Sequence, residues 1–144
     1  MKQIEVKGGD AMQAFGAGLS KEWFPTVYLP LIVFFKGDLG SGKTTLAQGI
    51  LAELGVTEAV TSPTYTIIEQ YDADIGLISH LDLYRLEQPS DISALGFEDI
   101  YSDSALVLIE WPEKATQYLP QPNYIVECLY IDSATRNVNI STIK

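Results

Sequence analysis

Apolar runs alternate with segments of helical and polar character along the chain, and this alternation predicts the order of its elements. Residues 31–35 are all apolar, as is typical of a strand buried on both faces, and residues 105–109 form a second such run that ends in Glu110. Residues 44–54 are predicted to form a helix that Gly55 ends. Because strands and helices interleave, the pattern predicts an α/β fold with a mixed, mainly parallel sheet flanked by helices.

The remaining segments predict further helices and antiparallel hairpins. Asp10 can cap a helix that runs to about Leu19, residues 21–30 form a connector, and residues 90–101 form short helical pieces interrupted by Gly96. Two pairs of strand-like stretches are joined by polar turns and predict hairpins: residues 62–71 with 76–83, and residues 124–131 with 138–142. The second hairpin is expected at an edge of the sheet.

Composition limits the class of protein. A length of 144 residues predicts one domain, residues 1–144, and contents of 47% hydrophobic and 19% charged residues are typical of a soluble globular chain. No apolar run is long enough to predict a transmembrane helix, and residues 1–5 contain no apolar signal core. The single Cys128 and the single His80 argue against a disulfide framework and a zinc site. Together these features predict a cytoplasmic protein that does not enter a membrane.

The charge balance indicates what kind of partner the chain binds. Nineteen acidic residues against nine basic ones give a formal net charge of −10, and Arg85 is the only Lys or Arg between Lys43 and Lys114. Nucleic-acid binding needs clustered cations that displace counterions from phosphates, and the sequence has no such cluster. We therefore expect that the chain does not bind RNA directly, and we favour a basic protein as its partner.

Residues 37–44 read Gly-Asp-Leu-Gly-Ser-Gly-Lys-Thr, which is a complete phosphate-binding loop between a predicted strand and a predicted helix. Backbone N–H groups of such a loop surround the α- and β-phosphates, and the helix N-terminus adds partial positive charge. Lys43 can reach the β- and γ-phosphates, and the hydroxyl of Thr44 is placed to bind magnesium. The predicted nucleotide-binding residues are Asp38, Leu39, Gly40, Ser41, Gly42, Lys43, Thr44 and Thr45.

A phosphate-binding loop also needs an acid that helps to hold magnesium, usually at the end of a neighbouring apolar strand. Glu110 fits this role because five apolar residues precede it and Trp111-Pro112 ends the strand. Thr44 and Glu110 are therefore the predicted metal ligands. The alternative is an acid that falls at a strand end without any function.

Asp82 is a second candidate acid. Strand alternation would place it on one face with His80 and Tyr84, where the three could position water, magnesium or a proton, unless this is a solvated hairpin face. Thr64, after Ser62-Pro63, could sense the γ-phosphate or belong to an ordinary turn. Arg85 could stabilise charge during hydrolysis or form a surface ion pair. The predicted catalytic residues are Lys43, Thr64, Asp82 and Glu110.

Four motifs, taken together, resemble the TsaE family, the bacterial P-loop ATPases of tRNA threonylcarbamoyladenosine biosynthesis. They lie in order and at matching spacing within residues 10–120: residues 38–46, 62–66, 80–86 and 109–113. The resemblance implies a cytoplasmic ATPase that uses ATP and Mg²⁺ and binds a complex of the TsaB and TsaD proteins. Its hydrolysis would support repeated threonylcarbamoyl transfer to the adenosine next to the tRNA anticodon, with tRNA contacted only through that complex.

The resemblance also implies roles for individual residues. Lys43, Thr44 and Glu110 match residues that serve phosphate and magnesium, and Asp82 and Trp111 match residues that the family requires. Trp111 could pack in the core, lie at the mouth of the site or anchor an interface. The turn over residues 132–136 only loosely resembles the Gly-Arg turn of relatives, so we assign no adenine contacts to it.

Other functions with the same phosphate cradle are less compatible with the sequence. A small-molecule kinase usually clamps phosphates with several Arg residues, whereas this chain has only Arg85 and Arg136. A GTPase would need an Asn-Lys-x-Asp segment, and none is present. A nucleotide-gated binding module, in which hydrolysis is incidental, differs from an ATPase only in whether turnover is needed.

Overall fold

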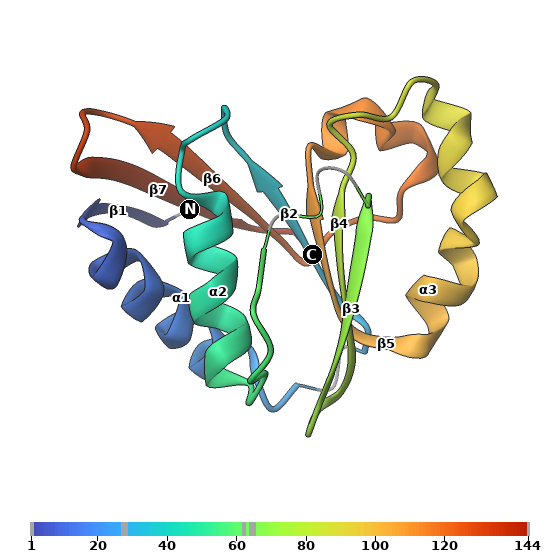
Figure 1. Ribbon diagram of the computed structural model, residues 1–144, viewed down its shortest axis with the longest axis horizontal. Helices are drawn as coiled ribbons and strands as arrows, with labels where there is room; N and C mark the ends of the chain where they lie inside the picture. The colour runs from blue at the N-terminus through green and yellow to red at the C-terminus, as the bar shows by residue number, and fades with distance from the viewer. Residues whose placement is uncertain (1, 27–28, 62, 64–65, 144) are drawn as a thin grey trace.

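The computed structural model describes residues 2–26, 29–61, 63 and 66–143, which form a seven-stranded sheet with helices against both faces (Figure 1). The strand order is β1-β7-β6-β2-β5-β4-β3. The strands are β1 (Lys2–Lys7), β2 (Leu31–Lys36), β3 (Ile68–Ala73), β4 (Gly76–Asp82), β5 (Ser104–Glu110), β6 (Tyr124–Tyr130) and β7 (Thr135–Thr142).

Parallel pairing is confined to the middle of the sheet. There β2 lies between β6 and β5, and β5 pairs with β4, all in parallel. The pairs β1–β7, β6–β7 and β3–β4 are antiparallel. The α/β class and the mixed sheet are thus confirmed, but parallel pairs make up half of the sheet rather than most of it. The tight turns that join β3 to β4 and β6 to β7 permit only antiparallel neighbours.

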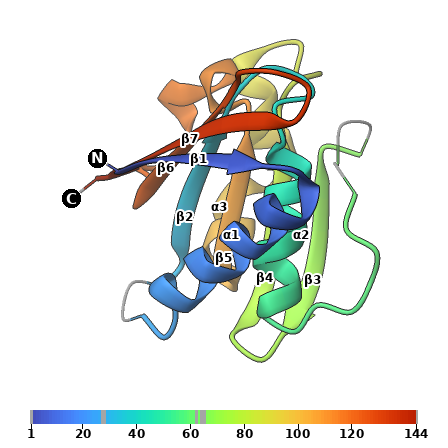
Figure 2. The same ribbon diagram turned by 90° about the vertical axis from the view of Figure 1, so that its left-hand side faces the viewer.

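Two helices cover one face of the sheet and the shorter helical segments cover the other. Figure 2 shows α1 (Gly9–Trp23) and α2 (Lys43–Glu53) in front of the strands. Behind them lie α3 (Phe97–Asp103) and the 3₁₀ helices η1 (Pro89–Leu95), η2 (Pro112–Lys114) and η3 (Thr116–Tyr118). Along β2, Val33 and Phe35 face the first layer, and Ile32 and Phe34 face the second. Both faces of this strand are therefore buried, as its unbroken apolar run predicts.

Helices α1 and α2 approach each other closely because glycines lie at their crossing. A Cβ atom on Gly16 would lie 2.5 Å from the carbonyl oxygen of Leu46, and one on Gly49 would collide with the backbone of Gln13. No larger side chain fits at either position without moving a helix. This contact fixes α1 against the helix that follows the phosphate-binding loop.

The structure differs from the sequence-based expectations at both ends of the chain. Helix α1 continues to Trp23, which is buried and stacks on Tyr124 with ring centroids 5.1 Å apart. Residues 21–23 are therefore helical and not a connector, because Trp23 extends the apolar face one turn beyond Leu19. The C-terminal hairpin is not at the sheet edge either, since β1 pairs with β7 and forms the edge itself. Among the described residues, no helix is both long and apolar enough to cross a membrane.

Candidate active site

The loop between β2 and α2 contains three glycines with positive φ angles. Gly37 has φ 144°, Gly40 has φ 77° and Gly42 has φ 104°. A Cβ atom on Gly37 would lie 2.5 Å from the carbonyl oxygen of Cys128 and 2.6 Å from Oγ of Ser41. The chain can therefore turn this tightly only with glycine, and the backbone rather than side chains forms the concavity. This construction fits a phosphate group, because clustered backbone N–H groups provide its donors.

Lys43, the first residue of α2, directs its ammonium group into this loop. Its Nζ donates a hydrogen bond to the carbonyl oxygen of Gly37 at 2.6 Å and lies 4.2 Å from the ring centroid of Trp111. Burial lowers the pKa of Lys43, while the carboxylates of Glu110 and Asp82 act in the opposite direction. The lysine is thus a poorly hydrated cation, and its attraction to a bound anion is stronger than it would be in water.

Two carboxylates lie beside the loop at the carboxyl ends of neighbouring strands. The register of β4 against β5 pairs Asp82 with Glu110, and the register of β2 against β5 pairs Phe35 with Glu110. Both acids are 2% exposed. The backbone N–H of Asp82 donates to the carbonyl oxygen of Ile67 at 2.8 Å, and its Oδ1 accepts from the N–H of Tyr84 at 2.9 Å. The end of β4 is therefore fixed to the segment that precedes β3.

His80 is the third buried polar group in this part of the sheet. Its Nε2 lies 2.6 Å from Oε2 of Glu110, and its side chain is fully buried. The prediction of one polar face is therefore correct for His80 and Asp82, and the alternative of a solvated face is wrong for both. Tyr84 does not share that face, because it lies beyond the end of β4; it is 37% exposed and packs against Trp111 with ring centroids 4.8 Å apart.

Trp111 lies where the backbone leaves β5. Its φ of 56° is unusual for a large side chain and turns the indole toward Lys43. The ring also packs at the border of the apolar cluster beneath α3. The position at the mouth of the site and the partial core packing are both present, so the functional role of Trp111 stays a prediction.

Sequence reasoning missed Arg136, which the structure places against the phosphate-binding loop. Its Nη2 donates to the carbonyl oxygen of Gly40 at 3.1 Å, and its guanidinium lies 4.6 Å from the ring centroid of Tyr130. The hairpin that carries Arg136 therefore lies beside the phosphate-binding loop. The parallel pairing of β6 with β2 carries the β6–β7 turn to the same edge as the loop, and no local pattern in the sequence signals that pairing.

The turn that carries Arg136 is held by Asp132. Its Oδ1 accepts hydrogen bonds from the backbone N–H groups of Ala134 and Thr135, at 2.9 and 2.8 Å. These bonds lower the pKa of Asp132, because they favour its ionised form. Nη1 of Arg136 donates to the carbonyl oxygens of Asp132 and Thr135, at 2.6 and 3.0 Å. The turn and the arginine therefore form one hydrogen-bonded unit.

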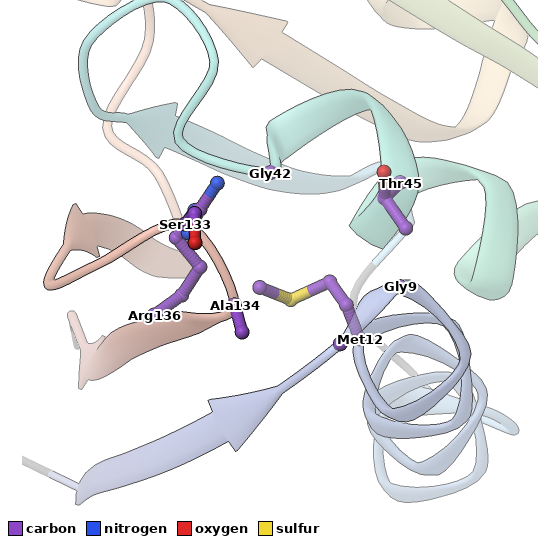
Figure 3. A pocket seen from close by; sticks show the side chains of 8 residues that line it. Gly9, Met12, Gly42, Thr45, Ser133, Ala134 and Arg136 are labelled. Carbon is purple, nitrogen blue, oxygen red and sulfur yellow. The ribbon is translucent and has the colours of Figure 1, made fainter.

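A small cavity of about 90 Å³ lies between this turn and the two helix N-termini (Figure 3). Its lining residues come from α1, from the loop and α2, and from the turn: Gly8, Gly9, Met12, Gly42, Thr45, Ser133, Ala134 and Arg136. Figure 3 shows Met12 from α1 reaching toward the side of the hollow where Ala134 and Arg136 lie. The cavity is contiguous with the start of α2 and offers apolar surface beside a guanidinium.

The structure brings together most of the predicted residues. Lys43, Asp82 and Glu110 converge, and Thr44 and Thr45 form the first turn of α2 beside them. Leu39 in the loop is 65% exposed. Thr64 lies outside the described residues, and Arg85 is exposed in the turn after β4. The roles assigned to these residues stay predictions.

The donor set fits a magnesium ion held together with a nucleotide. No group of three His, Cys, Asp or Glu side chains that could hold a metal occurs among the described residues. The Thr44 hydroxyl and the carboxylates of Asp82 and Glu110 are hard oxygen donors, of the kind that Mg²⁺ prefers. Mg²⁺ commonly uses one or two carboxylates and completes its shell with phosphate oxygens and water. The residues present therefore fit an ion that arrives with phosphate.

Known proteins resemble this chain in sequence and in fold. The family model described as threonylcarbamoyl adenosine biosynthesis protein TsaE matches residues 6–138. The chain is 41% identical to the tRNA threonylcarbamoyladenosine biosynthesis protein TsaE of Haemophilus influenzae over 110 residues, which cover 76% of this chain and 69% of that protein. It is 38% identical to the protein of the same name from Bacillus subtilis over 90 residues, 62% of this chain and 56% of that protein.

The crystal structure of YdiB from Bacillus subtilis has the same fold. It superposes with a TM-score of 0.77, covering 99% of this chain and 87% of YdiB, at 23% sequence identity. The mixed sheet flanked by helices is therefore an arrangement that a solved structure shares.

Proposed function

The chain belongs to the TsaE family, and we propose that it is the ATP-hydrolysing component of tRNA threonylcarbamoyladenosine biosynthesis, acting as a single domain over residues 1–144. One observation carries the proposal. The buried cation of Lys43 and the two buried carboxylates of Asp82 and Glu110 converge beside a loop that only glycine can form. This is the combination that phosphoryl transfer from magnesium-bound ATP requires.

In the proposed site the loop and Lys43 bind the phosphates. A bound β- or γ-phosphate would replace the carbonyl oxygen of Gly37 as the acceptor for Nζ of Lys43. Because the lysine is already desolvated, it needs no large loss of hydration when the phosphate arrives. Thr44 and Glu110 would hold Mg²⁺, which supplies positive charge to the transferring phosphoryl group.

Asp82 is the residue that we assign to the attacking water. It lies one strand away from Glu110, and its backbone and one carboxylate oxygen are held by hydrogen bonds. A carboxylate fixed in this way can orient a water molecule for in-line attack. Thr64 remains a proposed γ-phosphate sensor, and it lies outside the described residues.

The nucleoside end of ATP is proposed to lie over the cavity beside Met12, Ala134 and Arg136. The cavity adjoins Gly42 at the end of the loop and Thr45 in the first turn of α2, next to the backbone N–H groups that surround the α- and β-phosphates in proteins with this motif. Its apolar lining suits a purine ring, and Arg136 can stack on a ring or contact a phosphate.

The proposed partners are the TsaB and TsaD proteins, with tRNA contacted only through their complex, in the cytoplasm where tRNA is modified. The formal net charge of −10 supports docking to a protein rather than to RNA. Hydrolysis by P-loop enzymes is accelerated by an arginine that stabilises charge on the transferring phosphoryl group. Arg85 is exposed and Arg136 donates to Gly40 of the loop, so we assign this role to neither. We therefore expect slow hydrolysis by the chain alone and stimulation by the partners.

The test is ATP turnover by the pure chain, alone and with TsaB and TsaD, over a salt series. We expect slow turnover alone, stimulation by the partners, and weaker stimulation as salt screens the attraction, with a Debye length of about 8 Å at physiological ionic strength. If the chain alone hydrolyses ATP rapidly and TsaB and TsaD do not change its turnover rate, the result would instead favour a self-sufficient ATPase or a kinase. A variant that binds ATP but does not hydrolyse it separates an ATPase from a nucleotide-gated binding module, because only the module would still support tRNA modification.

A further inference from the structure

Among the residues that the structure describes near the site, His80 is a titratable group with a fully buried side chain to which the proposed reaction gives no role. It lies on β4 opposite Leu108 of β5, two residues before the pair Asp82 and Glu110. Its ring therefore reaches diagonally along the sheet to place Nε2 at 2.6 Å from Oε2 of Glu110. The other ring nitrogen, Nδ1, is buried and has no hydrogen-bond partner among the described residues.

We propose that His80 is a positioning residue that fixes the orientation of Glu110 for magnesium. This inference rests on the proposed function, in which Glu110 serves the ion. An ionised carboxylate can only accept hydrogen bonds, so Nε2 carries the hydrogen and donates it to Oε2. The bond holds one carboxylate oxygen against the sheet, and the remaining oxygen, Oε1, is the one that faces the ion or a water ligand of the ion.

A buried carboxylate needs such a partner for two reasons. The desolvated charge of Glu110 is costly unless donors are directed at it, and a short charge-assisted hydrogen bond meets part of that need. The glutamate side chain also has several rotatable bonds, so an unheld carboxylate would sample orientations in which no oxygen faces the phosphate-binding loop. Residues that orient the ligands of a metal typically change its affinity when they are removed.

The same two strands contain a polar pair that provides a matched control. Ser79 follows Ile78 on β4, and its Oγ lies 2.8 Å from Oγ of Ser104 on β5. Ser79 is fully buried, as His80 is, but its partner Ser104 is the first residue of β5 and lies at the opposite end of that strand from Glu110 and the loop. A general loss of strand packing would follow from either substitution, whereas a change in magnesium dependence should follow only from His80.

The first experiment compares His80→Leu, His80→Gln and Ser79→Ala in the full chain. We expect the Mg²⁺ concentration for half-maximal binding of a non-hydrolysable ATP analogue to rise roughly 10- to 100-fold in His80→Leu. Binding of the analogue in EDTA should not change. His80→Gln, which keeps an N–H donor near the position of Nε2, should restore most of the magnesium response, and Ser79→Ala should match the wild type.

The outcomes separate this inference from the proposed function. If the wild type shows no magnesium-dependent nucleotide binding, the proposed function fails. If the wild type depends on magnesium and a folded His80→Leu variant has the same requirement, the positioning role is wrong. Should His80→Leu not fold, a large magnesium defect in His80→Gln would equally count against the role, because that variant retains the donor.

The second experiment needs no nucleotide. The sequence contains one histidine, so its ring signals in a ¹⁵N-labelled sample are unambiguous. We expect a slowly exchanging, strongly downfield ring proton bonded to Nε2, and we expect its signal to move or disappear in Glu110→Ala. A ring proton on Nδ1, or one that Glu110→Ala leaves unchanged, would overturn the assignment.

Discussion

Two groups of residues flank the phosphate-binding loop, and one group is buried while the other is largely exposed. The strand-end side consists of Lys43, His80, Asp82 and Glu110. The hairpin side consists of Asp132, Ser133, Ala134 and Arg136. Groups on the strand-end side are at most 5% exposed, whereas the three turn residues of the hairpin side are exposed and Arg136 is half-buried.

The two sides differ in exposure because they lie in different parts of the sheet. The strand-end side lies on and beside parallel strands that are packed on both faces, so its charges are desolvated and have few alternative positions. The hairpin side is an antiparallel turn held to the loop by one hydrogen bond from Arg136 to Gly40. In the proposed function the buried side serves the chemistry of the phosphates, whereas the exposed side contributes only contacts at the rim of the site. Substitutions should therefore have large effects on the first side and smaller effects on the second.

The largest effect is expected for Lys43→Ala on the strand-end side. Removing the buried cation should lower ATP turnover by roughly 10²- to 10³-fold or more, because it eliminates charge that stabilises the transferring phosphoryl group. Steady-state phosphate release measures this, with circular dichroism to show that the fold survives. Lys21→Ala is a matched control, because it removes the same charge from an exposed residue that pairs with Glu53. Unchanged turnover in a folded Lys43→Ala protein would show that the assignment of this loop to phosphate binding is wrong.

The second effect separates the two acids. Asp82→Ala should keep nucleotide affinity but lose hydrolysis, because the proposed role of Asp82 is to orient water rather than to bind phosphate. Nucleotide binding by calorimetry and turnover are measured on the same sample. Asp72→Ala removes an exposed acid from β3 and serves as the control. Normal hydrolysis by Asp82→Ala would mean that this acid is structural.

Thr44→Ala and Glu110→Ala test the proposed magnesium ligands. Both variants should need more Mg²⁺ for half-maximal turnover, since each removes an oxygen that binds the ion directly or through water. A magnesium titration of turnover at fixed ATP gives the shift. If neither variant changes the requirement, the ion is held elsewhere.

A smaller effect is expected on the hairpin side. Arg136→Ala should weaken nucleotide binding by about fivefold, because it removes one hydrogen bond to the loop, worth about 1 kcal/mol. Lys7→Ala is the control, because it removes the same charge from an exposed residue of β1, the edge strand that pairs with β7, and it should leave nucleotide binding unchanged. A loss as large as that of Lys43→Ala would show that the two sides do not differ in the way proposed.

The smallest effect concerns Cys128, which lies on β6 beside the loop. Burial raises the pKa of this thiol to about 12 from its ordinary 9.0. Above pH 9 the unfolded chain therefore loses the thiol proton while the folded chain keeps it, so this group lowers stability as pH rises. Comparison of the urea unfolding midpoints of the wild type and Cys128→Ala from pH 8 to 10.5 should show a steeper decline for the wild type, whereas turnover at neutral pH should be nearly equal. Parallel declines would show that the thiol is not shielded.

Much of the strand-end side could be predicted because it depends on local pattern. Unbroken apolar runs predicted β2 and β5, and the spacing of the glycines and Lys43 predicted the loop. Asp82 and Glu110 could be chosen as site residues because each is an acid at the end of a predicted strand. These features arise from residues adjacent in the chain, where propensity and backbone sterics act directly. The α/β class followed from the order of those elements.

Only the tertiary structure decided the hairpin side and the contacts between the buried groups. Arg136 donates to Gly40 across 96 residues of sequence, and His80 meets Glu110 across 30. Both contacts depend on which strands become neighbours and in which register, as does the place of β1 at the edge beside β7. Register is set by the burial of whole faces against helices rather than by any single segment. The sequence by itself thus determined which chemical groups this protein has, and the packing of the sheet determined which of them meet.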